Sequence, residues 1–246
     1  MQDINLYLSG LLGLLIGSFL NVLILRIPKD ESIVFPSSHC TKCGKTLKWW
    51  HNIPVLSYIF LRGKCYYCKD KISLQYPIVE IFSSIIFVIS YIKTGDLAHG
   101  FAVALVFDIL LALSIIDFRY KAVPDSLNLT ALTISLFATT DIVTSFTNAL
   151  LFAGGFTLLR FYVSFFAKKE AMGEADIMIA ATIGAMLGIK LGIFCIFLSA
   201  VIALPVFLIV GKKDIQLPFI PFLALSLMIT YFFDFYFIKL ISWLYE

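Results

Sequence analysis

Four cysteines occur as two closely spaced pairs, a pattern typical of zinc knuckles. Two residues separate Cys40 from Cys43, two separate Cys65 from Cys68, and 21 residues lie between the pairs. Four thiolates paired in this way can surround Zn²⁺ tetrahedrally, although the interval is about one residue longer than in most ribbon-like sites. Two disulfides or four free thiols are the alternatives, and a reducing cytoplasm disfavours disulfides. We expect these four side chains to bind a structural zinc ion.

Three further side chains that could bind a metal are expected to have other roles. Cys195 lies in an apolar stretch, where a cysteine usually packs as a small hydrophobic residue. His39 and His51 lie near the cysteine pairs, but four thiolates already fill a tetrahedral site. We therefore expect neither histidine to be a ligand.

Seven carboxylic acids lie within or at the ends of apolar stretches, where a charge is costly and indicates function. They are Glu80, Asp108, Asp117, Asp125, Glu174, Asp176 and Asp234. Asp117 and Asp176 are expected at the cytoplasmic ends of two different helices. Because like charges held close cannot both ionise, two such carboxyl groups can share a proton. One can then activate water while the other protonates the leaving group, which would hydrolyse a peptide bond without a covalent intermediate.

Capping and ion pairing are the alternative roles for these two aspartates. Asp117 could pair with Arg119 and Asp176 with Lys169, since each partner lies nearby in the sequence. Asp125 follows a proline and precedes a helix, so we expect its side chain to accept backbone N–H bonds as a cap.

The remaining acids are expected to have other environments. Asp108 precedes Asp117 by nine residues, which places it roughly 13 Å deeper along a helix, where packing or pairing would explain it. Asp234 should lie toward the outer end of the last helix. Glu174 is expected to be a solvated neighbour of Asp176 that adds negative charge to the first turn of a helix.

Long apolar stretches must position all these side chains. The chain has 246 residues, of which 60% are hydrophobic and only 14% are charged. Residues 4–25 and 191–211 contain no charged side chain, and each is long enough to cross the bilayer as a helix. The first stretch is unlike a signal peptide, because no basic residue precedes it and the first one, Arg26, follows it. The first helix should therefore remain in the membrane.

Eight helices are predicted, and the distribution of basic residues orients them. They cover 4–25, 77–93, 99–117, 126–142, 145–166, 176–189, 191–211 and 216–240. Nine of the nineteen basic residues lie in 26–71 and six more form adjacent or nearly adjacent pairs: Arg119/Lys121, Lys168/Lys169 and Lys212/Lys213. If the chain turns near Gly188–Gly192, all fifteen of these basic residues lie on the same side of the membrane as residues 26–76. The positive-inside rule then makes that side cytoplasmic. The N-terminus is then outside.

Several segments, in order along nearly the whole chain, resemble the signatures of the type IV prepilin peptidases, which belong to the GxGD aspartyl class. Besides the cysteine pairs, they are "GSFLNVLILRIP" (17–28), "NIPVLSY" (52–58), "LRGKC" (61–65), "ISLQYPIVE" (72–80), "IDFRYKAVPDSL" (116–127), "MGEADIMIAATIGAMLG" (172–188) and "LPFIPFLAL" (217–225). No single segment is decisive, but the ordered set is highly specific.

The resemblance implies a function in the bacterial inner membrane. Asp117 and Asp176 would be the catalytic pair of a peptidase that cleaves the leader of a prepilin or pseudopilin after Gly. The enzyme would then methylate the new N-terminus with S-adenosylmethionine, an activity that goes with members carrying the cysteine domain. The substrates serve type IV pili or type II secretion, and no nucleic-acid partner is expected. No residue is assigned to the methyl donor.

This chain departs from the family pattern at two positions. Ala175 stands where the second motif has its second Gly, and Ile220 stands where Gly is common in the last. We expect Ala175 at negative φ, at or just before the first turn of its helix. Glu80 is a candidate for contact with the substrate amine, and helix packing is the alternative.

The sequence therefore predicts an all-α, multi-spanning membrane protein of about eight transmembrane helices. Its parts would be a first transmembrane helix (1–25), a small cytoplasmic four-cysteine zinc domain (26–76) and a membrane-embedded aspartyl peptidase domain (77–246). Alternatives are a peptidase without methylase activity, a zinc-knuckle adaptor, and a transporter with Asp108, Asp117 and Asp176 as a proton relay. Transporters tend to show repeated halves, and no internal repeat is visible here.

Overall fold

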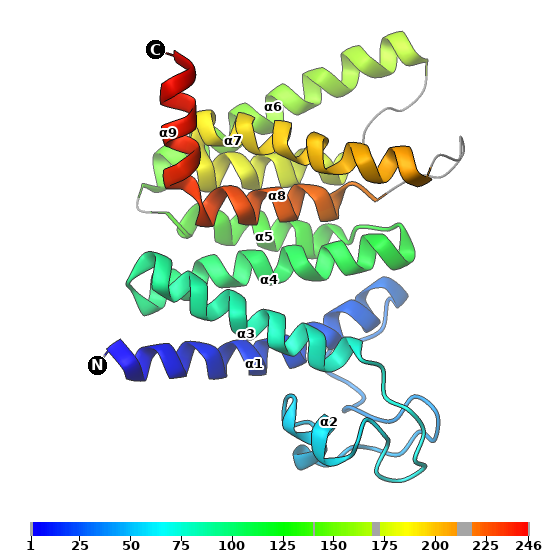
Figure 1. Ribbon diagram of the computed structural model, residues 1–246. Coiled ribbons are helices and arrows are strands. Elements are labelled where there is room, and N and C mark those ends of the chain that lie inside the picture. The colour runs from blue at the N-terminus through cyan, green and yellow to red at the C-terminus, as the bar shows by residue number, and fades with distance from the viewer. Residues whose placement is uncertain (1, 140, 169–172, 211–217, 246) are drawn as a thin grey trace. The chain divides into compact units, whose positions relative to one another are not determined.

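The computed structural model describes residues 2–139, 141–168, 173–210 and 218–245, and within these ranges the chain is helical with two isolated β-bridges and no strand (Figure 1). The α-helices are α1 (Gln2–Arg26), α2 (Leu56–Phe60), α3 (Gln75–Thr94), α4 (Leu97–Tyr120), α5 (Asp125–Phe137), α6 (Ile142–Ala167), α7 (Glu174–Val210), α8 (Ile220–Phe232) and α9 (Asp234–Tyr245). Two 3₁₀ turns, η1 (Ile27–Lys29) and η2 (Trp49–His51), lie between α1 and α2. The all-α prediction is confirmed.

Five of the described helices are long and apolar enough to cross a membrane, and α8 with α9 would make a sixth. The five are α1, α3, α4, α6 and α7. Each of the eight predicted segments is helical over most of the residues that the structure describes, but fewer count as separate spans, and residues 140, 211, 216 and 217 of these predictions lie outside the described ranges. The 13 residues of α5 fall short of the roughly 20 that a span needs, and two predicted helices belong to α7. The protein is a multi-pass helical membrane protein.

The expected turn near Gly188–Gly192 is present inside α7. Gly188 has φ 70° and ψ −172°, so its backbone leaves the helical region one residue before the end of the predicted helix 176–189. Only glycine adopts such a conformation readily, because it has no Cβ.

Two predicted helices end earlier or are broken, and in each case an aspartate stands at the start of the helix that follows. The helix predicted over 126–142 ends at Phe137, because Asp141 caps α6 by accepting hydrogen bonds from the N–H groups of Val143 and Thr144. The helix predicted over 216–240 is broken by a bend of 85°. Asp234 begins α9 there, where its side chain accepts a hydrogen bond of 2.6 Å from the N–H of Phe235.

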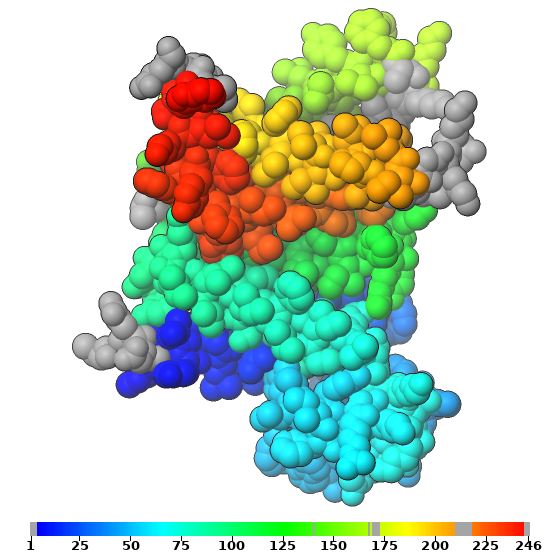
Figure 2. Space-filling model, viewed as in Figure 1, coloured from blue at the N-terminus to red at the C-terminus, as the bar shows by residue number. Residues whose placement is uncertain are grey.

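The chain forms two compact units, Met1–Asp108 and Ile109–Glu246. In the first, α1 and α3 lie side by side, and the residues between them form a small lobe at their common end (Figures 1 and 2). Glycines in α1 allow this approach. A Cβ on Gly13 would lie 2.6 Å from the Cα of Ser84, and one on Gly17 would lie 2.8 Å from the Cα of Glu80.

In the second unit, α7 packs against α6, α5 and α8. Alanines on the facing sides of α6 and α7 form part of the buried core. A Cβ on Gly184 would lie 2.7 Å from the carbonyl oxygen of Asn148, and one on Gly192 would lie 2.5 Å from Cζ of Phe152. Small residues therefore let α6 and α7 approach closely, as is common between helices in membranes.

The close contact between α1 and α3 predicts that Gly17→Ala destabilises the protein. The added methyl group would meet the backbone of α3, and overpacking of this kind costs about 1–3 kcal/mol. Thermal unfolding in detergent should show a lower midpoint than in the parent. Gly154→Ala is the control, because no atom lies within 4 Å of a Cβ at that position. Equal midpoints for all three proteins would contradict the prediction.

Candidate active site and metal centre

Each cysteine pair lies in a tight loop, and the two loops have the same backbone pattern. In the first, the N–H of Gly44 donates to the carbonyl of Cys40, and the N–H of Cys40 donates to the carbonyl of Lys45. In the second, Lys69 and Cys65 make the equivalent bonds, the latter to the carbonyl of Asp70. The residue after each pair has positive φ, 68° at Gly44 and 59° at Lys69. The shared loop geometry directs both pairs of thiols toward one another.

The four Sγ atoms lie within 4.8 Å of one another, so the cluster could hold a metal ion. None of the cysteines forms a disulfide, and the Sγ atoms of Cys40 and Cys68 are 3.8 Å apart. Four sulfurs at about 2.3 Å from a tetrahedral Zn²⁺ would also be about 3.8 Å apart. An exposed ion pair of 2.8 Å between Lys42 and Asp70 joins the two loops. The predicted four-cysteine cluster is therefore present.

Hydrogen bonds separate the acidities of these thiols. The backbone N–H groups of Cys43 and Lys42 lower the pKa of Cys40 to about 6, which favours a thiolate. The N–H of Asp70 lowers the pKa of Cys68, but desolvation and hydrogen bonds with the other three thiols raise it, to about 11. Thiols this close resist ionising together, and a cation among them would remove that conflict.

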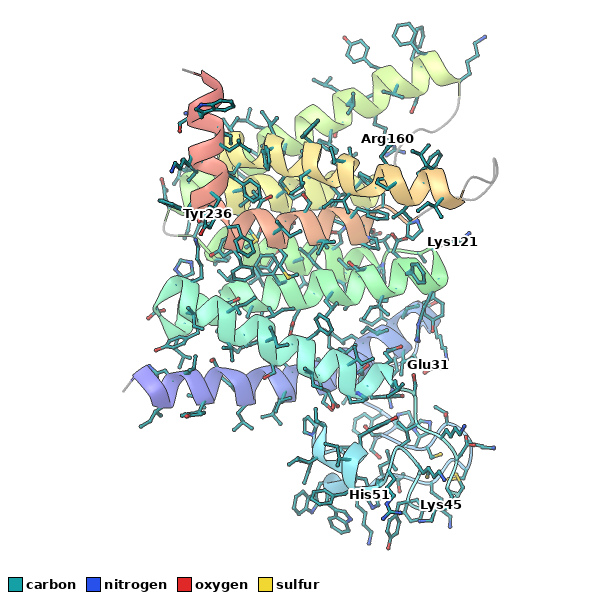
Figure 3. All side chains as sticks on the ribbon, in the orientation of Figure 1. Glu31, Lys45, His51, Lys121, Arg160 and Tyr236 are labelled. Atoms are coloured by element: carbon teal, nitrogen blue, oxygen red, sulfur yellow. The ribbon has the colours of Figure 1, made fainter. Side chains whose placement is uncertain are left out.

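Neither His39 nor His51 belongs to the cysteine cluster, as predicted. His39 Nδ1 lies 3.1 Å from the carbonyl oxygen of Ser37. His51 is buried in the small lobe (Figure 3). Its ring stacks on that of Tyr66, with ring centres 4.8 Å apart. Cys195 is buried in α7 next to Ser226 of α8, in agreement with its predicted packing role.

Asp117 lies in the last turn of α4 and is almost completely buried. Its carboxylate accepts a hydrogen bond from the N–H of Ile220, the first residue of α8. Helix starts carry N–H groups without intrahelical partners, so the beginning of α8 is suited to bind a carboxylate. The alternative ion pair with Arg119 is not formed in the described part of the chain.

Asp176 lies in the first turn of α7, partly buried, and accepts a hydrogen bond from the N–H of Gly173. Its carboxyl group is close enough to that of Asp117 for the two negative charges to interact. The structure thus brings together two side chains that are 59 positions apart, from α4 and α7 of the same unit. Lys169, the other partner considered for Asp176, is outside the described residues.

The two residues before Asp176 are tied to different helices. Glu174 forms an ion pair of 3.1 Å with Arg160 of α6, and 79% of its side chain is exposed, as expected for a solvated neighbour. Ala175 lies in the first turn of α7 and has negative φ, which confirms the prediction. Its carbonyl oxygen accepts a bond of 3.0 Å from the amide of Asn128 in α5. Sequence reasoning missed Asn128, although a lone amide in an apolar helix is a usable signal.

The other acids have structural partners. Glu80 accepts a hydrogen bond of 2.7 Å from the N–H of Val55 and another from the side chain of Ser18, so it ties the small lobe to α1 and α3. Asp108 is fully buried, 2.5 Å from Ser83 Oγ, in line with its expected packing role. Asp125 is the first residue of α5, but the predicted cap is absent because no side-chain bond closes that helix start.

Together, the apolar helices and the four-cysteine lobe define a multi-pass membrane protein with a candidate metal site, and its two neighbouring carboxyl groups are what an aspartyl peptidase would require. Comparison with known families agrees with this class. Residues 11–94 match the bacterial peptidase A24 N-terminal domain, and residues 104–208 match the type IV leader peptidase family.

Curated relatives cover most of the chain. A prepilin leader peptidase/N-methyltransferase of Xanthomonas campestris is 35% identical over 90% of this chain and 88% of its own length. Proteins of the same name from Vibrio cholerae and Legionella pneumophila are each 33% identical, over 82% and 91% of this chain and 85% and 89% of their own lengths. No solved structure matches. This chain belongs to the type IV leader peptidase family.

The position of Ala175 predicts how its substitution affects cleavage. Ala175→Gly should retain activity and change the free energy of unfolding by no more than about 1 kcal/mol, since Gly costs roughly that in a helix. Ala175→Val should do more harm, because a larger side chain in this turn would displace Asp176 from Asp117. Cleavage of a prepilin by the purified variants tests both expectations. A Val variant that cleaves as well as the parent would refute them.

Proposed function

We propose that this chain cleaves the leader peptide of type IV prepilins or pseudopilins after Gly and then methylates the new N-terminus. The curated relatives bear the name of this bifunctional enzyme, and the match to this chain covers 88% and 89% of the length of two of them. The observation that supports the proposal is that the carboxyl groups of Asp117 and Asp176 are close enough for their charges to interact. The reaction takes place at the cytoplasmic face of the inner membrane, with the N-terminus of the chain outside.

The two aspartates divide the chemistry of hydrolysis. One carboxylate takes a proton from water as the water oxygen attacks the carbonyl carbon of the leader's Gly. The other, protonated, carboxyl group gives its proton to the departing amine, so the C–N bond breaks without a covalent intermediate. Neighbouring like charges favour this division, because one of the pair then keeps a proton.

The cysteine lobe is proposed to bind Zn²⁺ through Cys40, Cys43, Cys65 and Cys68. The mutual distances of the sulfurs and the thiolate character of Cys40 support this choice of ion. The chain would then consist of a first membrane helix (1–25), a cytoplasmic zinc domain (26–76) and a membrane-embedded peptidase domain (77–246). S-adenosylmethionine would supply the methyl group, as the names of the relatives suggest.

Incubation of the purified protein with a prepilin in detergent tests the two activities. Mass spectrometry should find a product shortened by its leader and, with S-adenosylmethionine present, carrying one added methyl group. Asp117→Asn and Asp176→Asn should each abolish cleavage and leave folding intact, because the amide keeps the shape without acid–base function.

Asp125→Asn is the matched control for the aspartate pair, because its exposed side chain caps nothing and should cost little activity. A cleavage-dead Asp125→Asn beside an active Asp117→Asn would show that the wrong carboxylate had been chosen. A shortened but unmethylated product would identify a peptidase without methylase activity.

Metal analysis tests the zinc site separately. The purified protein should contain about one zinc per chain, and Cys40→Ser or Cys68→Ser should lower the content and destabilise residues 36–72. Cys195→Ala is the control, because that thiol lies outside the cluster. Cleavage should survive zinc loss better than methylation does, since the aspartates lie on other segments. Metal-free protein after careful preparation would exclude the site.

A further inference from the structure

Asn128 of α5 is a buried polar residue whose side-chain amide makes a hydrogen bond through its nitrogen but not through its oxygen. Its side chain is fully buried, and Nδ2 donates a hydrogen bond of 3.0 Å to the carbonyl oxygen of Ala175. The other end of the amide, Oδ1, is buried without a hydrogen-bond partner in the described part of the chain. Only the Nδ2 end can bind a carbonyl oxygen, so the orientation of the amide is fixed.

Such an amide is a poor choice for stability alone. A buried acceptor without a partner loses its bonds to water and gains nothing in return, and buried polar atoms are rarely left in this state. An apolar side chain of similar volume would avoid that loss. The carbonyl of Ala175 lies in the first turn of α7, so it can still accept the intrahelical bond there. The stability of the fold therefore does not explain the amide of Asn128. The position of its hydrogen bond, next to Asp176, explains it better.

The bond acts on the residue next to Asp176. Besides the bond that Asp176 accepts from the N–H of Gly173, two contacts in the described part of the chain join the first turn of α7 to other helices. Arg160 of α6 pairs with Glu174, and Asn128 of α5 binds Ala175. The Glu174 side of the ion pair is 79% exposed and the Arg160 side is 23% exposed, and pairs with one partner this solvated contribute little. The bond from Asn128 is partly buried and joins α5 directly to the backbone before Asp176. Of the two, it is the one that can fix the position of that carboxyl group.

We propose that Asn128 is a positioning residue of the aspartate pair, which sets the place of Asp176 relative to Asp117 through the carbonyl of Ala175. This inference rests on the proposed peptidase function. Two carboxyl groups can share a proton only while they are held close, and misplacement by about 1 Å can cost about 100-fold in rate. The reaction rate, rather than substrate affinity, should therefore depend on the amide.

Asn128→Leu tests the role of the amide, because leucine has a similar volume and no donor. Its kcat for leader cleavage should fall about 10- to 100-fold with little change in KM. Its thermal midpoint should be equal to or higher than that of the parent, because the unpartnered Oδ1 has gone. Asn128→Gln keeps the amide donor and should recover part of kcat. Glu174→Gln, which weakens the exposed ion pair, is the matched control and should retain the parent's kcat.

A structural readout makes the test independent of the assay. Amide hydrogen exchange in residues 174–178 should be faster in Asn128→Leu than in the parent, with the rest of α7 unchanged. The inference is overturned if Asn128→Leu keeps the parent's kcat, or if its loss of kcat follows a lower thermal midpoint, as a merely structural role requires. If the parent itself releases no leader, the proposed function fails instead, and the exchange pattern alone decides whether Asn128 anchors α7.

Discussion

The free-energy cost of placing a carboxyl group away from water organises much of this structure. Such a group must find a hydrogen-bond donor, and in a helical membrane protein that donor usually lies on another segment. Asp108 of α4 meets Ser83 of α3, Glu80 of α3 meets the N–H of Val55 in the lobe, and Asp117 of α4 meets the N–H of Ile220 in α8. Each acid therefore links the element on which it lies to a second element. Within each compact unit, the acids supply some of the polar contacts between elements, beside those made by amides and hydroxyl groups such as Asn128 and Ser226.

The small lobe shows how a segment with little regular structure can be held. Between η1 and α3, a stretch that the structure describes in full, the only helices are the five-residue α2 and the single turn η2, and many large side chains there are exposed, among them Trp49 and Phe60. A domain this small seldom buries enough apolar surface to fold by that means alone, and a metal ion commonly supplies the rest. Two knuckles joined by the Lys42–Asp70 pair provide such a site, and the bond between Glu80 and Val55 fixes the lobe to the membrane helices.

The sequence could predict the features that depend on composition and local chemistry. The apolar stretches, the cysteine cluster, the break at Gly188 and the helical position of Ala175 belong to this class. Features that depend on partners distant in the sequence were missed. Two local features were missed as well. The positive φ of Lys69 goes with the knuckle's own hydrogen bonds, since lysine itself does not favour it, and the break before Asp234 lies between two apolar segments. The bond from Asn128 to Ala175 joins residues 47 positions apart, a pairing that no local pattern encodes.

The two departures from the family pattern fall where the backbone, and not the side chain, makes the contact. Ile220 meets Asp117 through its N–H, a group that glycine also has. Ala175 meets Asn128 through its carbonyl and keeps a negative φ that any residue can adopt. Asp117 stands in the last turn of its helix, where free carbonyls disfavour a negative charge, so it needs the N–H groups that begin α8. A change of side chain at either position leaves those backbone contacts available, provided that the new side chain fits. The site therefore depends on where α7 and α8 begin more than on which small or apolar residue begins them.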